Sequence, residues 1–134
     1  MGENFCFTVN GVERCTSEDK PLLRYLRDDL HLHSVKDGCS EGACGTCTIV
    51  VDGKAVKSCV LTTRRAVGKN IITTEGLSDA EKEAFVYAFG AMGSVQCGFC
   101  TPGMVMAGKA LIDRVPDPTE EEIKVALKGN ICRC

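Results

Sequence analysis

The sequence has no large excess of charge of either sign. Its 134 residues carry a formal net charge of −2, and no long run of lysine and arginine occurs. Proteins that bind nucleic acid or an anionic membrane surface by charge concentrate basic residues on one face or in one segment. The sequence therefore gives no support to nucleic-acid binding or to a polybasic membrane contact.

Long hydrophobic runs are missing as well. No segment approaches the roughly 18 consecutive apolar residues that suggest a membrane-spanning helix. Residues 1–6 have neither the basic nor the apolar region of a secretory signal, and Cys6 stands where a myristoylation motif has Ser or Thr. We therefore expect a soluble, cytoplasmic protein with no membrane partner.

Cysteine is the residue that the sequence has in excess, with ten of them. In a secreted chain of this size they would suggest disulfides, but without a secretory signal they favour metal binding or redox chemistry. Two of them, Cys6 and Cys15, lie outside the groups described below, one on each arm of a predicted hairpin. We expect these two to be buried, inert thiols.

The first half of the chain has the pattern of short strands with one helix. An Asn-Gly pair at 10–11 and an Asp-Gly pair at 52–53 predict tight hairpin turns. Between them, a helix is expected over 21–30, where leucines recur every four residues, and Asp19 is its candidate N-cap. A further short strand is expected at 71–74.

The second half has the pattern of three helices. Ser78 and Thr119 each begin a capping box, and Thr101 with its following proline begins the helix between them. The helical period runs through Ala84, Phe85, Ala88, Phe89 and Met92 in the first helix, with Phe85 and Phe89 expected in the core. In the other two it predicts a buried side made of Val105, Ala107, Ala110, Leu111, Ile112, Ile123, Ala126 and Leu127. Residues 1–76 are thus predicted to be α+β and residues 77–134 all-α, with no long linker between them.

The first cysteine group has a spacing known from plant-type ferredoxins. Cys39, Cys44 and Cys47 form C-x4-C-x2-C, and Cys59 follows on the returning arm of the second hairpin. This is the plant-type spacing for a 2Fe–2S cluster. Glycines at 38, 42 and 45 permit the tight bends that bring three thiolates together. A zinc site or disulfides are the alternatives, although zinc sites favour C-x2-C pairs. We call this predicted site cluster one.

The second cysteine group comprises Cys97, Cys100, Cys132 and Cys134. C-x2-C paired with C-x-C is compatible with a zinc site, a second cluster or a redox disulfide. Cys100 directly precedes a predicted helix, whose N-terminal dipole favours negative charge. Gly129 lets the chain turn back before Cys132, so the two pairs are expected to meet at the ends of antiparallel helices. We call this predicted site cluster two.

Three motifs resemble those of the small iron–sulfur subunit, or N-terminal domain, of the molybdenum hydroxylases. They are C-S-E-G-A-C-G-T-C at 39–47, Q-C-G-F-C-T-P-G at 96–103 and G-N-I-C-R-C at 129–134. The family includes xanthine dehydrogenases, aldehyde oxidoreductases and nicotinate dehydrogenase. The resemblance covers essentially the whole chain, and it favours an iron–sulfur cluster over zinc in both groups.

The resemblance implies a fold, a set of ligands and a set of partners. It implies a plant-ferredoxin-like (β-grasp) domain over 1–76, followed by an all-α helical-bundle domain over 77–134, each with a 2Fe–2S cluster held by its own four cysteines. By position, Gln96 and Cys134 would lie against molybdopterin. Electrons would pass from molybdopterin through cluster two and cluster one to FAD, with molybdenum on a large partner subunit and FAD on a medium one.

The predicted function is electron transfer within an oxidoreductase complex, with no catalytic residue on this chain. A freestanding two-cluster ferredoxin is the alternative, and a zinc-stapled interaction module is a third possibility. A purine such as xanthine is the first expectation for the substrate of the complex, with nicotinate, aldehydes and aromatic acyl-CoA thioesters open. The family pattern continues beyond the last cysteine, so we expect the helical domain to be truncated at Cys134 or to lack a final helix.

Overall fold

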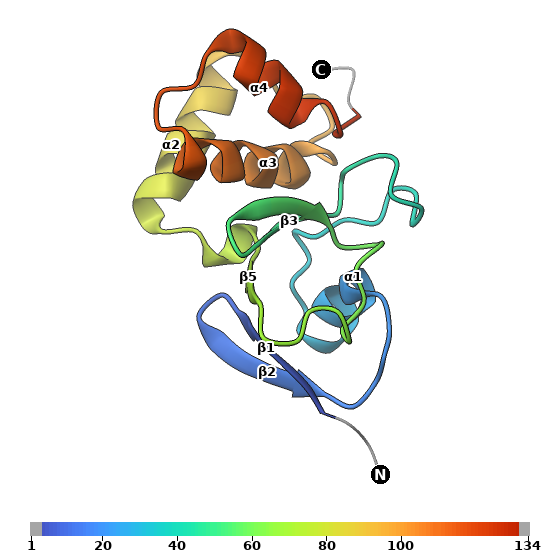
Figure 1. The fold of residues 1–134 in the computed structure, drawn as a ribbon. Coiled ribbons are helices and arrows are strands. Elements are labelled where there is room, and N and C mark those ends of the chain that lie inside the picture. The colour runs from blue at the N-terminus through green and yellow to red at the C-terminus, as the bar shows by residue number, and fades with distance from the viewer. Residues whose placement is uncertain (1–3, 132–134) are drawn as a thin grey trace.

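The computed structural model describes residues 4–131 as one mixed sheet with helices on both sides of it (Figure 1). The helix at 101–114 lies over the end of the sheet formed by residues 48–57, and a short helix of the first half lies on the opposite side. In chain order the elements are β1 Phe5–Val9, β2 Val12–Thr16, α1 Leu22–Arg24, η1 Tyr25–Asp29, β3 Thr48–Val51, β4 Lys54–Lys57, β5 Asn70–Ile72, η2 Thr74–Gly76, α2 Asp79–Ala91, α3 Thr101–Arg114 and α4 Glu120–Leu127.

The sheet has the strand order β2-β1-β5-β3-β4. Both hairpin pairs are antiparallel, β5 pairs antiparallel with β3, and β1 pairs parallel with β5. The two predicted hairpin turns are confirmed: Asn10 and Gly11 have φ of 51° and 82°, and Asp52 and Gly53 have φ of 50° and 82°. Positive φ at both central residues is the requirement of the type I′ turn, which Asn-Gly and Asp-Gly meet at low cost.

The first hydrophobic core lies between the sheet and the helix at 22–29. Alternate residues of β1 point into it, so Phe5, Phe7 and Val9 are buried. The helix contributes Leu22 and Leu26, both fully buried as the leucine spacing predicted. Burying side chains of this size contributes roughly 1.5–3 kcal/mol each.

The predicted helix over 21–30 changes its winding, and its predicted N-cap is wrong. After α1 the chain continues as a π-turn, in which the Leu30 N–H donates to the Tyr25 carbonyl oxygen at 3.1 Å. The N-cap position is held by Pro21 and makes no side-chain cap. Asp19 instead accepts a hydrogen bond from Arg64 Nε at 3.2 Å. A side-chain cap is not needed, because the first helical N–H is paired with a backbone carbonyl of residue 61.

The prediction that Cys6 and Cys15 are buried thiols is also wrong. They lie opposite each other in the β1–β2 register and form a disulfide, with Cα atoms 4.1 Å apart. Cys6 is half-buried and Cys15 is exposed, because the alternation that buries Phe5 and Phe7 turns the residue between them outward. The signal was present in the sequence: positions equidistant from a two-residue turn face each other across the hairpin.

The helices of the second half begin as predicted, but their burial differs. Ser78 and Thr119 form complete capping boxes, whereas Thr101 begins α3 without capping it. On α3, four of the five predicted core residues are buried, and Ile112 is 46% exposed. On α2 no residue is fully buried, and Met92 is 79% exposed. On α4, Ile123 is exposed and the other two predicted core residues are half-buried.

A second hydrophobic core joins the two halves of the chain. It contains Val50 of β3, Leu77, and Val105, Met106 and Ala110 of α3, with Phe85 and Phe89 of α2 packed at its margin. The alternation of β3 sends Val50 toward α3 and its neighbours on either side into the first core. Ile112 points away from this contact, which explains its exposure. Within residues 4–131, no helix has the length and apolar character needed to cross a bilayer.

Candidate metal centres

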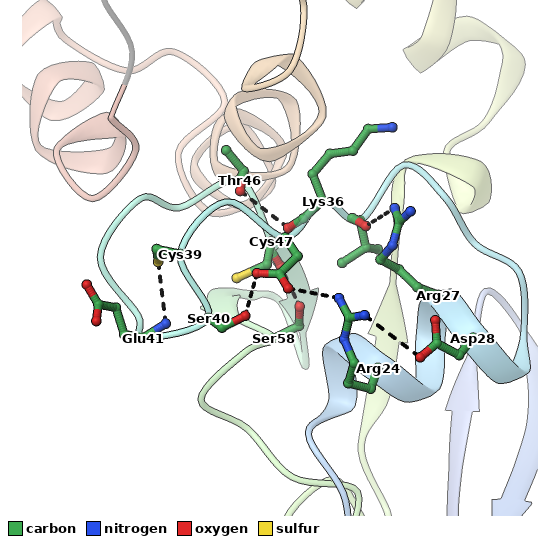
Figure 2. Close-up of polar contacts among 12 residues, drawn as sticks. Arg24, Arg27, Asp28, Lys36, Cys39, Ser40, Glu41, Thr46, Cys47 and Ser58 are labelled. Carbon is green, nitrogen blue, oxygen red and sulfur yellow. Dashed lines mark hydrogen bonds and ion pairs between the residues drawn. The ribbon is translucent and has the colours of Figure 1, made fainter.

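The loop that carries the first cysteine group is tied to the helix before it (Figure 2). The Arg27 guanidinium donates to the carbonyl oxygens of residue 33 at 3.0 Å and of Val35 at 2.8 Å. Arg24 pairs with Asp37 at 3.0 Å, and the Ser40 hydroxyl donates to the same carboxylate at 2.5 Å. These contacts fix the chain on both sides of Cys39, the first cysteine of the group.

Backbone N–H groups of this loop point at cysteine sulfurs. Cys59 Sγ accepts from the Gly42 N–H at 3.2 Å. Cys39 Sγ accepts three such bonds, at 3.4, 3.3 and 3.3 Å, from the N–H groups of Glu41, Ala43 and Cys44, the first of which is drawn in Figure 2. Such bonds stabilise thiolate charge and help to set the potential of a cluster bound there.

The four sulfurs of the first group form two neighbouring pairs, Cys39 with Cys44 and Cys47 with Cys59. No three of these four sulfurs lie within 4.8 Å of one another. The second pair lies deeper, since Cys47 is buried and its carbonyl oxygen accepts a hydrogen bond from the Ser58 hydroxyl at 2.8 Å (Figure 2). Strand β4 thus brings the fourth cysteine to the loop, as the hairpin prediction required.

Cys39 and Cys59 differ in acidity. The N–H groups of Glu41, Cys44 and Ala43 lower the pKa of Cys39 to about 7. Partial burial, followed by the neighbouring Cys47 thiol, raises the pKa of Cys59 to about 11. A bound metal would have to supply the positive charge that keeps Cys59 as a thiolate.

Glycine at position 38 is needed for space. A Cβ there would lie 2.8 Å from Cys44 Sγ and 2.8 Å from Thr46 Oγ1. That hydroxyl is 3.1 Å from the Cys44 sulfur and donates to the Lys36 carbonyl oxygen at 3.3 Å (Figure 2). The sequence analysis attributed the glycine at 38 to a tight bend. Positive φ is found instead at Gly42 and Gly45, with φ of 78° and 80°, so the reason for glycine at 38 is space.

The second cysteine group is described only in its first half. Cys100 is buried directly before α3, as predicted, and Cys97 and Gln96 are exposed. The hydroxyl of Thr101 is buried beside them and has no hydrogen-bond partner within residues 4–131. Cys132 and Cys134 lie outside the described residues.

The donor set and its surroundings suit an iron–sulfur cluster. The first group offers four cysteine sulfurs with four backbone N–H groups aimed at two of them, on a Gly-containing loop of plant-ferredoxin spacing. Within residues 4–131, the second group offers two sulfurs and, at the N-terminus of a helix, a hydroxyl with no hydrogen-bond partner. Fold and donors together define a ferredoxin-like protein with a helical part.

Two family models match the chain, and together they span nearly all of it. Residues 7–84 match the 2Fe-2S iron-sulfur cluster binding domain, and residues 73–134 match the 2Fe-2S binding domain. The small FeS subunit of nicotinate dehydrogenase from Eubacterium barkeri is 48% identical over 129 residues, covering 94% of this chain and 82% of that subunit. The iron-sulfur-binding subunit of xanthine dehydrogenase from Escherichia coli O157:H7 is 45% identical over 132 residues, covering 95% and 82%.

Solved structures agree with this assignment. Quinoline 2-oxidoreductase from Pseudomonas putida 86 gives a TM-score of 0.88 at 36% identity, covering 99% of this chain and 84% of the matched chain. The aldehyde oxidoreductase from Desulfovibrio desulfuricans ATCC 27774 gives 0.89 at 37% identity, covering 98% of this chain and 15% of that longer one. The chain therefore belongs to the family of small iron–sulfur subunits of the molybdenum hydroxylases, which includes those of nicotinate and xanthine dehydrogenases.

Proposed function

We propose that this chain is the electron-transfer iron–sulfur subunit of a molybdenum-containing hydroxylase. The observation that carries the proposal is the loop of plant-ferredoxin spacing whose N–H groups point at cysteine sulfurs, within a chain whose two halves match 2Fe–2S domain models. Cluster one is held by Cys39, Cys44, Cys47 and Cys59, and cluster two by Cys97, Cys100, Cys132 and Cys134. When bound, the two clusters supply one-electron carriers.

The chain's own residues hold and shield these groups. In cluster one, the N–H groups around Cys39 stabilise thiolate charge on the outer side, while the buried Cys47 keeps water from the inner side. We assign cluster one to a β-grasp domain over 1–76 and cluster two to a helical domain over 77–134. The overlap of the two family models, at residues 73–84, supports this division.

The proposed partners are a molybdopterin-binding large subunit and an FAD-binding medium subunit. Gln96 and Cys134 are assigned to the face that meets molybdopterin, which is compatible with the exposure of Gln96 beside Cys97. Contiguous exposed apolar patches commonly mark protein interfaces. On this chain, large exposed apolar side chains gather on α2 and the loop after it: Val86, Tyr87, Met92, Val95 and Phe99. The proposed location of the complex is the cytoplasm.

Substrate choice belongs to the molybdenum subunit. Similar small subunits carry the names of enzymes for nicotinate, nicotine, xanthine and isoquinoline, at identities of 48%, 43%, 45% and 38%. A relay subunit touches no substrate, so similarity among such subunits does not distinguish one substrate from another. Neither the purine nor the nicotinate expectation is favoured by a residue of this chain.

The test is co-expression with the neighbouring subunits, followed by metal analysis and EPR of the purified complex. Two distinguishable 2Fe–2S signals and about four irons per chain are expected. One cluster accompanied by zinc would contradict the proposal. A native monomer that keeps both clusters in size-exclusion chromatography would favour the freestanding ferredoxin instead.

A further inference from the structure

The last described residues lie against the loop of the first cysteine group. Residues 129–131 follow α4 and turn toward that loop. The Ile131 N–H donates to the Cys44 carbonyl oxygen at 2.8 Å, and the Asn130 side-chain Nδ2 donates to the Gly45 carbonyl oxygen at 3.0 Å. The second of these bonds joins positions 85 residues apart in the chain.

The approach is so close that it requires glycine on two sides. A Cβ on Gly45 would lie 2.5 Å from the Gly129 carbonyl oxygen. A Cβ on Gly103, in the first turn of α3, would collide with the Gly45 carbonyl oxygen and lie 3.3 Å from Asn130 Nδ2. The Asn130 amide therefore lies where three backbone segments meet.

Each of these segments carries a proposed cluster ligand. The loop at Gly45 carries Cys44, the start of α3 follows Cys100, and Asn130 lies two positions before Cys132. The Ile131 hydrogen bond connects two of the segments directly. From Cys44 to the residue that precedes Cys132, the connection consists of covalent bonds and one hydrogen bond.

Electron tunnelling slows steeply as distance grows and as gaps replace bonds, so the spacing of these segments sets the rate between the two clusters. We propose that Asn130 is a positioning residue for electron transfer between cluster one and cluster two, an inference that rests on the proposed function. Its amide holds the segment leading to Cys132 against the Gly45 carbonyl, and so maintains the hydrogen bond from Ile131 to Cys44. Contacts one layer outside the ligands commonly change the behaviour of a metal site 10–100-fold.

The variants change the hydrogen bond from the Asn130 amide to the Gly45 carbonyl oxygen. Asn130→Ala removes the amide, and Asn130→Asp keeps its volume while replacing the donor by an acceptor. Asn10→Asp is the matched control, because it makes the same amide-to-carboxylate change at a contact that touches neither cysteine group, where the Asn10 amide donates to Thr73 Oγ1 at 2.9 Å. All are made in the complete complex of subunits.

The measurements report on spacing and rate, and not only on activity. EPR of the dithionite-reduced complex gives the magnetic interaction between the two reduced clusters, and pulse radiolysis gives the rate at which an injected electron equilibrates between them. Both Asn130 variants should keep both clusters, show a weaker interaction and equilibrate roughly 10-fold more slowly. Asn10→Asp should match the wild type in both measurements.

Unchanged interaction and unchanged rates in both Asn130 variants would overturn the positioning role. Loss of cluster two in both variants would also overturn it, because Asn130 would then be needed for assembly rather than for transfer. The wild-type complex separates this inference from the proposed function. If the wild type lacks two 2Fe–2S signals, the proposed function fails; if it has them and the variants behave like it, only the inference fails.

Discussion

Cys39 and Cys59 are assigned to one cluster but lie in opposite surroundings. The Cys39 sulfur accepts three backbone N–H bonds, whereas the Cys59 sulfur accepts one and is desolvated beside Cys47. A free thiol at position 59 therefore stays protonated at neutral pH, and a metal has to displace its proton. Of Cys39 and Cys59, it is therefore Cys59, the residue after the β3–β4 hairpin, whose thiolate form depends more on a bound metal.

Replacing that ligand should remove one cluster and leave the other. Cys59→Ser is expected to lower the iron content from about four to about two per chain and to remove one of two EPR signals. The double variant Cys6→Ser/Cys15→Ser is the control, because it removes two cysteines outside both groups and should keep all the iron. Retention of both clusters in Cys59→Ser would contradict the ligand assignment.

The lack of space beside the Cys44 sulfur gives a second prediction for a single residue. Gly38→Ala would place a methyl group 2.8 Å from Cys44 Sγ, so the loop must shift and the iron content of cluster one should fall. Gly90→Ala is the control, because a Cβ there meets nothing within 4 Å. In helix α2 it should increase the free energy of unfolding by about 0.5–1 kcal/mol. Iron analysis measures the cluster content of the two variants, and urea unfolding measures their free energy of unfolding. A full iron content in Gly38→Ala would refute the steric argument.

At the scale of the elements, helix α2 is attached to the rest of the protein mainly through its first turn. Ser78 and Glu81 form its capping box, and Lys109 of α3 pairs with Glu81 at 2.5 Å and with Asp113 at 3.0 Å. Lys109 is only 9% exposed, whereas no residue of α2 is fully buried. The Lys109–Glu81 ion pair therefore anchors α2, whose hydrophobic contacts lie along only one edge of the helix.

This anchor should depend on pH. The hydrogen bond from Lys109, followed by the Ser78 N–H, lowers the pKa of Glu81 below its usual value of 4.5. A carboxylate whose pKa is lower in the folded state than in the unfolded state stabilises the fold at pH values above its unfolded-state pKa. That stabilisation is lost as the pH falls through the folded-state pKa. Glu81→Gln keeps a capping side chain and removes only the charge, so it should cost about 1 kcal/mol at pH 7 and progressively less below about pH 4.5.

Glu122→Gln is the matched control for that change. Glu122 fills the same position in the capping box of α4, where no lysine pair is present among the described residues. Its cost at pH 7 should be clearly smaller than that of Glu81→Gln. Urea unfolding followed by circular dichroism at several pH values compares the two; equal costs would mean that the Lys109 pair contributes nothing.

At the scale of the whole molecule, strand β3 belongs to two cores. Ile49 and Val51 pack into the first core, and Val50 packs against Met106 and Val105 of α3 in the second. The ferredoxin-like part and the helical part therefore share a strand. Loss of either core exposes the other, so we expect one unfolding transition for the described part of the chain.

Truncating the residue at the centre of the second core tests that coupling. Met106 is 1% exposed, and Met106→Ala should destabilise the protein by about 2–4 kcal/mol while keeping one transition. Ile112→Ala on the same helix removes a side chain that is 46% exposed and should cost less than about 1 kcal/mol. Visible absorbance of the clusters and far-UV circular dichroism should change together in urea, and two separated transitions would rule out a shared core.

Features that depend on near neighbours could be predicted from the sequence. The turns at 10–11 and 52–53 and the capping boxes at Ser78 and Thr119 were correct, because their hydrogen bonds close within a few residues. The exposure of Ile112 was not predicted, since a helical period shows that a side is apolar but not how wide the neighbouring element is.

By itself, the sequence determined which metal chemistry the first cysteine group predicts, because C-x4-C-x2-C with a distant fourth cysteine is the plant-type 2Fe–2S spacing, whereas the spacing of the second group left zinc open. Only the tertiary structure decided that residues 129–131 close on the loop of Cys44, that position 38 has no room for a Cβ, and that Cys6 is joined to Cys15. Contacts across 85 residues leave no periodic trace in a sequence, since they depend on how whole elements pack.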